Sequence, residues 1–186
     1  MRAFAAIEIP ENIRDRIGKY QDNLRSAFPE RSLKWVGTDK LHVTLRFFQS
    51  IDSRQAQNVI DALGMAATAC TSFEMTISGS GTFPNSKKPR VLWLGIDVLP
   101  VLKRLKSSID QHLEEQGFEP ETRTFRPHLT IARSKNPSKA RRLADLHLSQ
   151  EFKPAGFKVS RVVLMESVLK PAGSEYSLIE AFDLSG

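Results

Sequence analysis

The sequence predicts an α+β protein in which short strands and amphipathic helices alternate along 186 residues. Apolar runs of strand length recur from residue 2 to residue 184. Several segments between them carry apolar residues at helical spacing, and the connections are of hairpin type rather than repeated strand-helix-strand crossovers. No linker is long enough to divide the chain, so we expect a single domain over residues 1–186.

In the first half of the chain, strands alternate with two helices. Pro10 marks the start of the first helix and Pro29 its end, with apolar residues at helical spacing between them. The second helix has Val59 and Leu63 on its apolar face. The expected elements are strands over residues 2–9, 33–36 and 41–48, a turn at 37–39, and helices over 11–28 and 54–68.

The second half repeats this alternation. A helix begins at Pro100 and stops at Gly117, and a short basic helix follows later. The polar segment 84–89 is rich in turn-forming residues, which predicts an exposed loop. The expected elements are strands over residues 73–83, 90–96, 128–133, 157–169 and 176–184, and helices over 100–116 and 138–148.

The composition narrows the class of protein. Lys and Arg total 27 against 21 Asp and Glu, and a net charge of +6 favours anionic partners such as nucleic acid without proving one. No apolar run approaches the length of about 20 residues that spans a bilayer. The N-terminal segment does not resemble a signal peptide, and the single cysteine, Cys70, fits a reducing compartment. We therefore expect a cytoplasmic protein with no membrane partner.

Two segments carry the same order of histidine, aliphatic residue, threonine and aliphatic residue. They are Leu41-His42-Val43-Thr44-Leu45 and Pro127-His128-Leu129-Thr130-Ile131. With four His and nine Thr in the chain, chance produces two His-x-Thr triplets in about one or two sequences of a hundred. Residues two apart in a strand share a face, so each segment presents His and Thr together. One triplet is typical of an ordinary half-buried strand, whereas the pair indicates a site.

Two imidazoles facing one cavity suit an in-line displacement at phosphorus. A neutral histidine removes a proton from water, and a protonated one donates to the leaving oxygen. Thr44 and Thr130 can then donate hydrogen bonds to the non-bridging phosphate oxygens. Catalytic zinc takes about three protein ligands, and neither triplet supplies a nearby carboxylate or third histidine. We expect no metal and no other cofactor.

These triplets and their flanking segments resemble a known family. The flanking segments are Leu33-Lys34-Trp35-Val36, Leu41 to Phe48 and Phe125 to Arg133. The chain resembles the two-histidine (2H) phosphoesterase superfamily, and within it the RNA 2′,3′-cyclic phosphodiesterases, or LigT-like 2′-5′ RNA ligases. The resemblance extends over essentially the whole chain. One departure is Phe48-Gln49, where the family often has Leu-Gly, and it concerns a turn rather than the catalytic atoms.

The resemblance implies a bilobal fold with pseudo-two-fold symmetry, in which two antiparallel sheets line a central cleft and helices lie outside. It implies metal-free hydrolysis of a 2′,3′-cyclic phosphate end of RNA to a 2′-phosphomonoester. His42 and His128 are then the acid–base pair, and Thr44 and Thr130 hold the phosphate. Which histidine is the acid stays open. The expected partner is RNA with a 2′,3′-cyclic phosphate terminus, and we expect a monomer.

Four further residues are candidates for substrate contacts. Arg133 and Phe47 each lie five residues after a histidine, and the resemblance makes them candidates for phosphate and base contacts. Strict strand alternation instead places Arg46 and Arg126 on the faces of the histidines, and a β-bulge would reconcile the two arrangements. Core packing for Phe47 and solvation for the arginines are the ordinary alternatives. We expect at least one arginine to bind phosphate through its fork of donors.

Other functions compete with hydrolysis. The same site supports the reverse reaction, in which tRNA halves are joined by a 2′-5′ linkage. A non-catalytic RNA-binding protein on the same fold is a second alternative, although both His-Thr pairs are present here. A small cyclic nucleotide is a third, as a different substrate. His112 and His147 lie on expected helices without a matching Thr and suit surface or packing roles, and Cys70 has no partner base.

Overall fold

The computed structural model describes residues 1–28, 33–171 and 173–186. Its strands are β1 (Ala3–Glu8), β2 (Leu33–Trp35), β3 (His42–Phe48), β4 (Phe73–Phe83), β5 (Val91–Ile96), β6 (His128–Ser134), β7 (Ala155–Val159), β8 (Arg161–Lys170) and β9 (Gly173–Asp183). Its helices are α1 (Glu11–Ala27), α2 (Ser53–Thr68), α3 (Pro100–Glu115) and α4 (Pro137–Ser149), with a short 3₁₀ helix at Thr38–Lys40.

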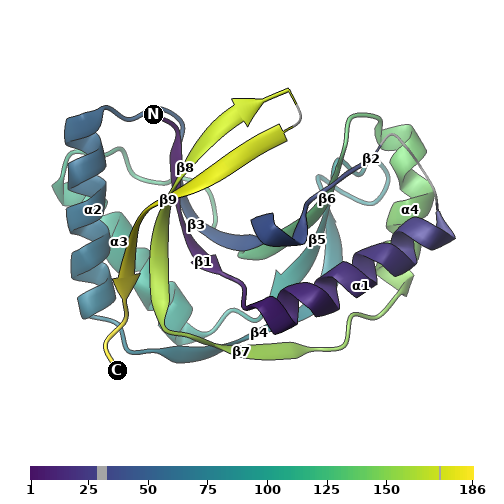
Figure 1. Ribbon diagram of the computed structural model, residues 1–186, viewed down its shortest axis with the longest axis horizontal. Helices are drawn as coiled ribbons and strands as arrows, with labels where there is room; N and C mark the ends of the chain where they lie inside the picture. Colours follow the sequence, from purple (N-terminus) through teal and green to yellow (C-terminus); the bar gives the residue numbers. More distant parts are fainter. Residues whose placement is uncertain (29–32, 172) are drawn as a thin grey trace.

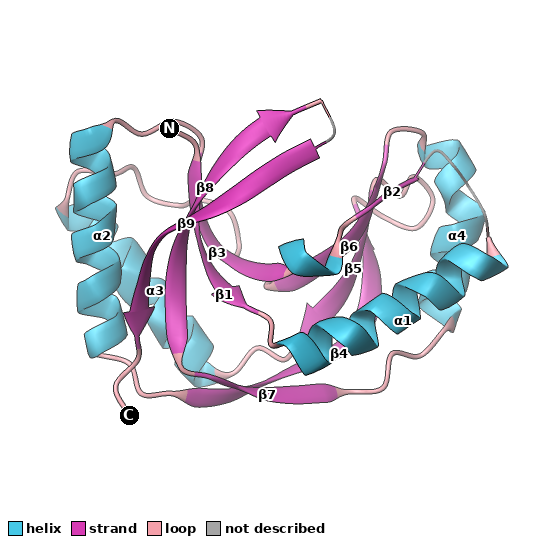
Figure 2. Ribbon diagram, viewed as in Figure 1, coloured by secondary structure: helices cyan, strands magenta, loops and turns pink. Residues whose placement is uncertain are grey.

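The strands form two antiparallel sheets. Sheet A has the strand order β3-β1-β8-β9, and sheet B has the order β2-β6-β5-β4-β7. The two sheets face each other across the middle of the molecule, with α2 and α3 outside sheet A and α1 and α4 outside sheet B (Figures 1 and 2). This arrangement confirms the α+β fold with two sheets and outer helices that the sequence and its resemblance predicted.

The order of elements in the first half is repeated in the second. β1, α1, β3 and α2 correspond to β5, α3, β6 and α4, and in both sets the two strands pair with each other. The helix between them crosses to the other sheet. Gln21 of α1 thus donates to the carbonyls of Val36 and Ile131 beside sheet B, whereas α3 packs with α2 beside sheet A. This exchange of helices joins the two sheets into one structure.

Local sequence signals account for most helix ends. Pro10 is the N-cap residue of α1, and Asp52 opens α2 with a capping box in which its carboxylate accepts from the Gln55 backbone. α3 starts at Pro100 and ends just before Gly117, whose φ of 86° is favourable only for glycine. Pro29, which we expected to end the first helix, lies outside the described residues.

The strand expected over residues 157–169 is wrong as a single element. The chain changes sheets at Ser160, so that β7 pairs with β4 in sheet B and β8 pairs with β1 and β9 in sheet A. Apolar alternation continues through this point, and only the long-range partners of each half reveal the break. The turn expected at 37–39 is likewise a 3₁₀ helix one residue later.

Burial in the sheets separates a core side from a cleft side. Val43 and Leu45 of β3, like Leu129 and Ile131 of β6, are fully or almost fully buried in the main hydrophobic core. A smaller apolar cluster of Phe4, Ala6 and Val163 lies separately on sheet A, with Met165 and Tyr176 packed against it. None of the helices in the described residues is both long and apolar enough to cross a membrane.

Candidate active site

The two His-x-Thr strands are built in the same way. In both β3 and β6, burial alternates through the histidine, the aliphatic residue and the threonine, and two consecutive buried residues follow. The strand pairing shifts at this point in each sheet, between Ala5 and Ala6 opposite β3 and between Leu92 and Trp93 opposite β6. Leu45 and Ile131 are therefore the extra residues of two equivalent β-bulges.

The bulges decide which side chains reach the cleft. Each bulge reverses the alternation, so the residue five positions after the histidine shares its face. Phe47 and Arg133 are accordingly exposed on the cleft side, whereas Arg46 turns to the buried side. One cavity of about 310 Å³ is lined by both histidines, both threonines and these two residues: His42, His128, Thr44, Thr130, Phe47 and Arg133.

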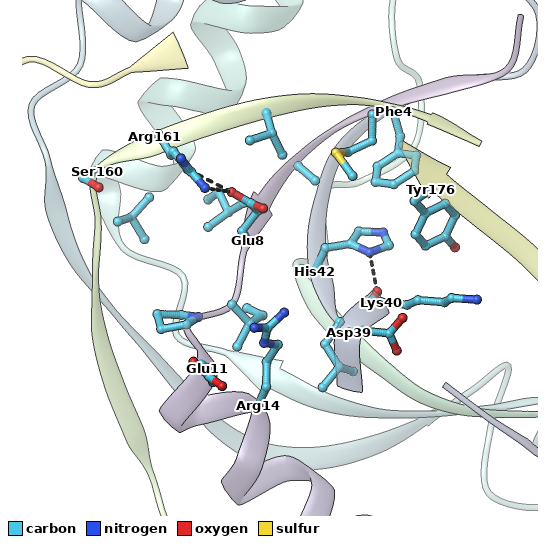
Figure 3. A pocket seen from close by; sticks show the side chains of 18 of the residues that line it. Phe4, Glu8, Glu11, Arg14, Asp39, Lys40, His42, Ser160, Arg161 and Tyr176 are labelled. Carbon is cyan, nitrogen blue, oxygen red and sulfur yellow. Dashed lines mark hydrogen bonds and ion pairs between the residues drawn. The ribbon is translucent and has the colours of Figure 1, made fainter. Parts of the chain in front are cut away.

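The two imidazoles are held in the same orientation. His42 Nδ1 donates to the carbonyl of Lys40 at 2.8 Å (Figure 3), and His128 Nδ1 donates to the carbonyl of Arg126 at 2.7 Å. In each case the acceptor lies two residues before the histidine. Because Nδ1 holds the proton in the neutral ring, Nε2 keeps its lone pair for a ligand in the cavity.

Aromatic side chains enclose both histidines, with a different geometry in each sheet. The Phe4 ring stacks on His42 with a centroid separation of 4.5 Å and an interplanar angle of 25°, and Tyr176 meets His42 edge-on at 5.4 Å. His128 meets Phe83 edge-on at 5.0 Å, and Trp93 lies at 6.2 Å. These rings pack against the imidazoles and shield them from water, in agreement with the desolvation of both histidines.

Burial lowers the pKa of both histidines. For His42 the desolvation of the ring is the main cause, the Lys40 carbonyl opposes it, and the positive charges of Arg133 and His128 lower the pKa further. The pKa of His128 is lowered in the same way by burial and by Arg133, against the Arg126 carbonyl. Near neutral pH the site thus favours neutral imidazoles until an anion binds.

Arg2 is a residue of this cavity that the sequence did not reveal. Its guanidinium lies 4.7 Å from the centroid of the Phe47 ring, and its Nε is buried without a hydrogen-bond partner among the described residues. Arg2 and Phe4 are two residues apart at the start of β1, so strand alternation places them on one face. No feature of the sequence near Arg2 indicates that this face of β1 lies at the same cavity as the two histidines.

Lys40 and Tyr176 also line the cavity, and they come from distant parts of the chain. Lys40 Nζ donates to the carbonyl of Ser174 at 3.0 Å, which ties the 3₁₀ helix before β3 to the hairpin of β8 and β9. This hairpin carries Tyr176 over His42. No sequence motif marks either residue: Lys40 lies directly before β3, whereas Tyr176 reaches the site only through the strand pairing of sheet A.

The structure places neither Arg46 nor Arg126 in the lining of the cavity, and a substrate contact of Arg126 stays a prediction. Arg46 is only 9% exposed, pairs with Asp110 at 3.2 Å, and donates to the carbonyl of Glu119 at 2.6 Å. The bulge at Leu45 is the physical reason, because it turns Arg46 away from the cleft. Arg126 contributes its carbonyl to His128, while its exposed side chain does not line the cavity.

The remaining histidines and the cysteine have surroundings that match packing or surface positions. His147 is fully buried and bonded to the Tyr20 hydroxyl at 2.9 Å, and His112 pairs with Glu115 on the surface of α3. Cys70 is buried, and burial raises the pKa of its thiol. None of these groups lies at the cavity of His42 and His128.

Comparison with known proteins agrees with this arrangement. The family described as the 2′-5′ RNA ligase superfamily matches residues 9–170. An RNA 2′,3′-cyclic phosphodiesterase from Methanothermobacter thermautotrophicus is 35% identical over 185 residues, which cover 99% of each chain. Another, from Methanocaldococcus jannaschii, is 31% identical over 181 residues, which cover 97% of this chain and 99% of the relative.

Solved structures share the fold. The protein TT0787 of Thermus thermophilus is 27% identical, with a TM-score of 0.83, 100% coverage of this chain and 99% of that chain. Escherichia coli LigT in complex with 3′-AMP is 22% identical, with a TM-score of 0.78 and coverage of 100% and 98%. With the match over residues 9–170 and relatives above 30% identity along nearly their full length, this chain belongs to the 2′-5′ RNA ligase superfamily.

Proposed function

We propose that this protein hydrolyses the 2′,3′-cyclic phosphate at an RNA end to a 2′-phosphomonoester, by acid–base catalysis with His42 and His128. The observation that carries the proposal is the repeated strand geometry. Two equivalent bulged strands bring two imidazoles, whose Nε2 atoms have no hydrogen bond within the described residues, and two threonine hydroxyls to one cavity of about 310 Å³. Cyclic phosphate hydrolysis is the activity named for the curated relatives.

The chemistry needs only the side chains of this cavity. A neutral histidine takes a proton from water as the oxygen attacks phosphorus, the P–O3′ bond breaks, and the second histidine protonates O3′. Charge accumulates on the non-bridging oxygens, where Thr44 and Thr130 donate hydrogen bonds and Arg133 supplies a positive charge. Phe47, backed by the guanidinium of Arg2, offers a flat exposed face to the terminal base.

Arg2 extends the contact beyond the reacting phosphate. Its guanidinium lies against the Phe47 ring, whereas the positive charge of Arg133 lowers the pKa of both histidines. Arg133 therefore suits the cyclic phosphate, and Arg2 suits the next group along the RNA, such as the preceding phosphate or the edge of the base. This division favours an RNA end over a small cyclic nucleotide.

Metal independence is part of the proposal. Across residues 1–28, 33–171 and 173–186, no three His, Cys, Asp or Glu side chains gather as a set able to hold a metal ion. None of the described residues that line the cavity is a carboxylate, so the donor set suits proton transfer better than coordination of zinc. A cytoplasmic location and a monomeric state remain predictions.

A short RNA with a 2′,3′-cyclic phosphate end tests the proposal directly. Wild type, His42→Ala, His128→Ala and the surface control His112→Ala are compared in EDTA, and the products are resolved as 2′- and 3′-phosphates. We expect a 2′-phosphate from wild type and His112→Ala, with both site variants slower by about 10²-fold or more. Activity that needs added metal, or a 3′-phosphate product, contradicts the proposal. Tight RNA binding without turnover by wild type identifies a binding protein instead.

A further inference from the structure

The catalytic pocket adjoins two further cavities, each of about 390 Å³. The first, called here the second cavity, continues past His42 toward the start of α1 (Figure 3). The other, called here the basic groove, lies between strand β2 and the hairpin of β8 and β9 (Figure 1). The basic groove shares five lining residues with the catalytic pocket: Val36, Lys40, Arg133, Ser174 and Tyr176. A substrate larger than one nucleotide can therefore leave the catalytic pocket in two directions.

The two cavities differ in charge. The basic groove is lined by four cationic side chains and by no carboxylate among the described residues; the cations are Lys34, Lys40, Arg133 and Lys170. The second cavity also has four cations, but its lining includes the carboxylates of Glu8, Glu11 and Asp39 (Figure 3). RNA carries a negative phosphate at each linkage, so the basic groove attracts the strand more strongly than the second cavity does.

Strands β2 and β6 place two of the cations side by side. Lys34 and Arg133 are directly opposite each other in the strand pairing, so their exposed side chains share the cleft face of sheet B. Like charges in this arrangement repel each other, and a phosphate that contacts both offsets the repulsion. Arg133 also lines the catalytic pocket, so this pair leads directly from the reacting phosphate into the basic groove.

The hairpin of β8 and β9 forms the opposite wall. A side chain at Gly173 would come within 2.6 Å of Lys34 Nζ, which shows that this ammonium group reaches the hairpin from sheet B. Leu169 is 65% exposed and lies opposite Ser174, so it presents an apolar surface to the groove beside the cations. Lys170 pairs with Glu175 at 2.7 Å, but both side chains are about half exposed, and such a pair is weak enough to exchange for a phosphate.

We propose that the basic groove binds the nucleotide that precedes the terminal one, so that the RNA strand leaves the active site between β2 and the hairpin and not past His42. The inference rests on the proposed function, because the cyclic phosphate must occupy the pocket of His42 and His128. Phe47 and Arg2 line the catalytic pocket but not the groove, and they remain contacts of the terminal nucleotide. Neither histidine lines the groove, so it determines affinity and chain-length preference without taking part in proton transfer.

Substrates of different length test this assignment. A nucleoside 2′,3′-cyclic phosphate is compared with a trinucleotide that ends in the same nucleoside cyclic phosphate. We expect wild type to prefer the trinucleotide by about tenfold or more in kcat/KM, mainly through KM, because the groove contributes binding that is the same in the ground state and the transition state. This preference should decrease as the salt concentration rises.

Charge reversal in the two cavities distinguishes the two directions. Lys34→Glu with Lys170→Glu is expected to lower kcat/KM for the trinucleotide by about tenfold and to leave the mononucleotide within about twofold. The matched control is Arg14→Glu with Lys158→Glu, which makes the same charge change in the second cavity and should leave the trinucleotide within about twofold. Leu169→Asp changes a side chain that is mostly exposed, keeps the fold, and should also lower only the trinucleotide rate.

A binding measurement keeps the inference separate from catalysis. Leu169 lines the basic groove and not the catalytic pocket, so its labelled methyl groups report on the groove by NMR. We expect a trinucleotide with a 2′-phosphate end to shift the Leu169 signals, and a nucleoside 2′-phosphate to leave them unchanged. Leu148, which is exposed on α4 and lines none of the three cavities, is the control signal.

The outcomes separate the two proposals. Equal kcat/KM of wild type for the two substrates overturns the groove and leaves the proposed hydrolase intact. A loss of the trinucleotide preference in the Arg14→Glu, Lys158→Glu control, with the preference kept in the Lys34→Glu, Lys170→Glu variant, also overturns it, because the strand then passes His42. Absence of hydrolysis of both substrates counts against the proposed function, whereas the Leu169 signals still show whether the trinucleotide occupies the groove.

Discussion

The two histidine strands share a backbone but not their surroundings. β3 and β6 have the same burial pattern, the same position of the bulge, and the same hydrogen bond from Nδ1 to a carbonyl two residues earlier. At the fifth position after the histidine, however, sheet A presents Phe47 and sheet B presents Arg133. The repeated part is the geometry that proton transfer and phosphate binding require, and the differing part is the contact with the rest of the substrate.

The surroundings also make the two histidines unequal. His42 lies under the stacked Phe4 ring and borders two cavities, whereas His128 meets Phe83 edge-on and borders one. The pKa of His42 is lowered by the charge of His128 in addition to that of Arg133. A duplicated fold therefore gives two similar acid–base groups, and the residues around them give each a separate role.

Replacement of the histidines should have the largest effect and should be alike in the two strands. His42→Ala and His128→Ala each remove one of two coupled proton transfers, so we expect a loss in kcat of about 10²-fold or more from either. The double variant should be little worse than a single one, because the two groups act as a unit. Single-turnover rates of the two single variants and the double variant measure these losses. If one single variant keeps near wild-type activity, the equivalence of the strands fails.

The threonines provide the next comparison. Thr44→Val and Thr130→Val keep a β-branched side chain in the strand and remove only the hydroxyl donor, so each should lower kcat/KM by about tenfold to a hundredfold. Thr→Ser at either position should restore most of the activity. A loss that Ser does not restore would indicate that the methyl group packs the strand and that the hydroxyl has no contact with phosphate.

Replacement of Arg133 and of Phe47, which each lie five residues after a histidine, should have different effects: the first on the pKa values of the histidines, and the second on stacking with the RNA base. Arg133 lowers the pKa of both histidines, so Arg133→Met is expected to raise both pKa values and to move the maximum of kcat/KM to higher pH. In wild type this maximum should lie below pH 6.5, the ordinary pKa of histidine, because both values are lowered. Phe47→Leu should weaken binding of the RNA by about tenfold without a shift in pH.

A pH–rate profile of the two variants decides this point. A profile that is unchanged in Arg133→Met contradicts the electrostatic role of Arg133, and a shifted profile in Phe47→Leu contradicts the division between charge and stacking. Substrate affinity is measured with a 2′-phosphorylated RNA product, so that binding is read independently of turnover.

Replacement of Arg46, the residue four positions after His42, should affect stability and not catalysis. Arg46 pairs with Asp110 and bonds the Glu119 carbonyl in a buried setting, whereas Ala132 holds the same place in β6. Lys106 also pairs with Asp110, so Arg46→Met does not leave that carboxylate alone. We expect a loss of about 1–3 kcal/mol in the free energy of unfolding, measured in urea, with kcat/KM nearly unchanged. A large loss of kcat/KM in a stably folded variant would show that Arg46 takes part in substrate binding or catalysis.

Much of the local structure follows from patterns within a few residues. The helices from Pro10, Asp52 and Pro100 begin near the expected positions because proline geometry and side-chain caps act locally. The run 157–169 misled the sequence interpretation because an apolar alternation reads the same whether its two halves join one sheet or two. Arg46 and Phe47 were ambiguous for a related reason, since a bulge depends on the partner strand.

The sequence alone determined the α+β class, the family and the pair of His-x-Thr segments, because alternation along a strand and a repeated motif are local and can be read directly. Only the tertiary structure decided that both bulges turn the fifth residue into the cleft and that Arg46 is buried. It also brought Arg2, Phe4 and Tyr176 to the cavity of His42. These features depend on pairing between strands far apart in the chain, whose register is set by the packing of the whole fold.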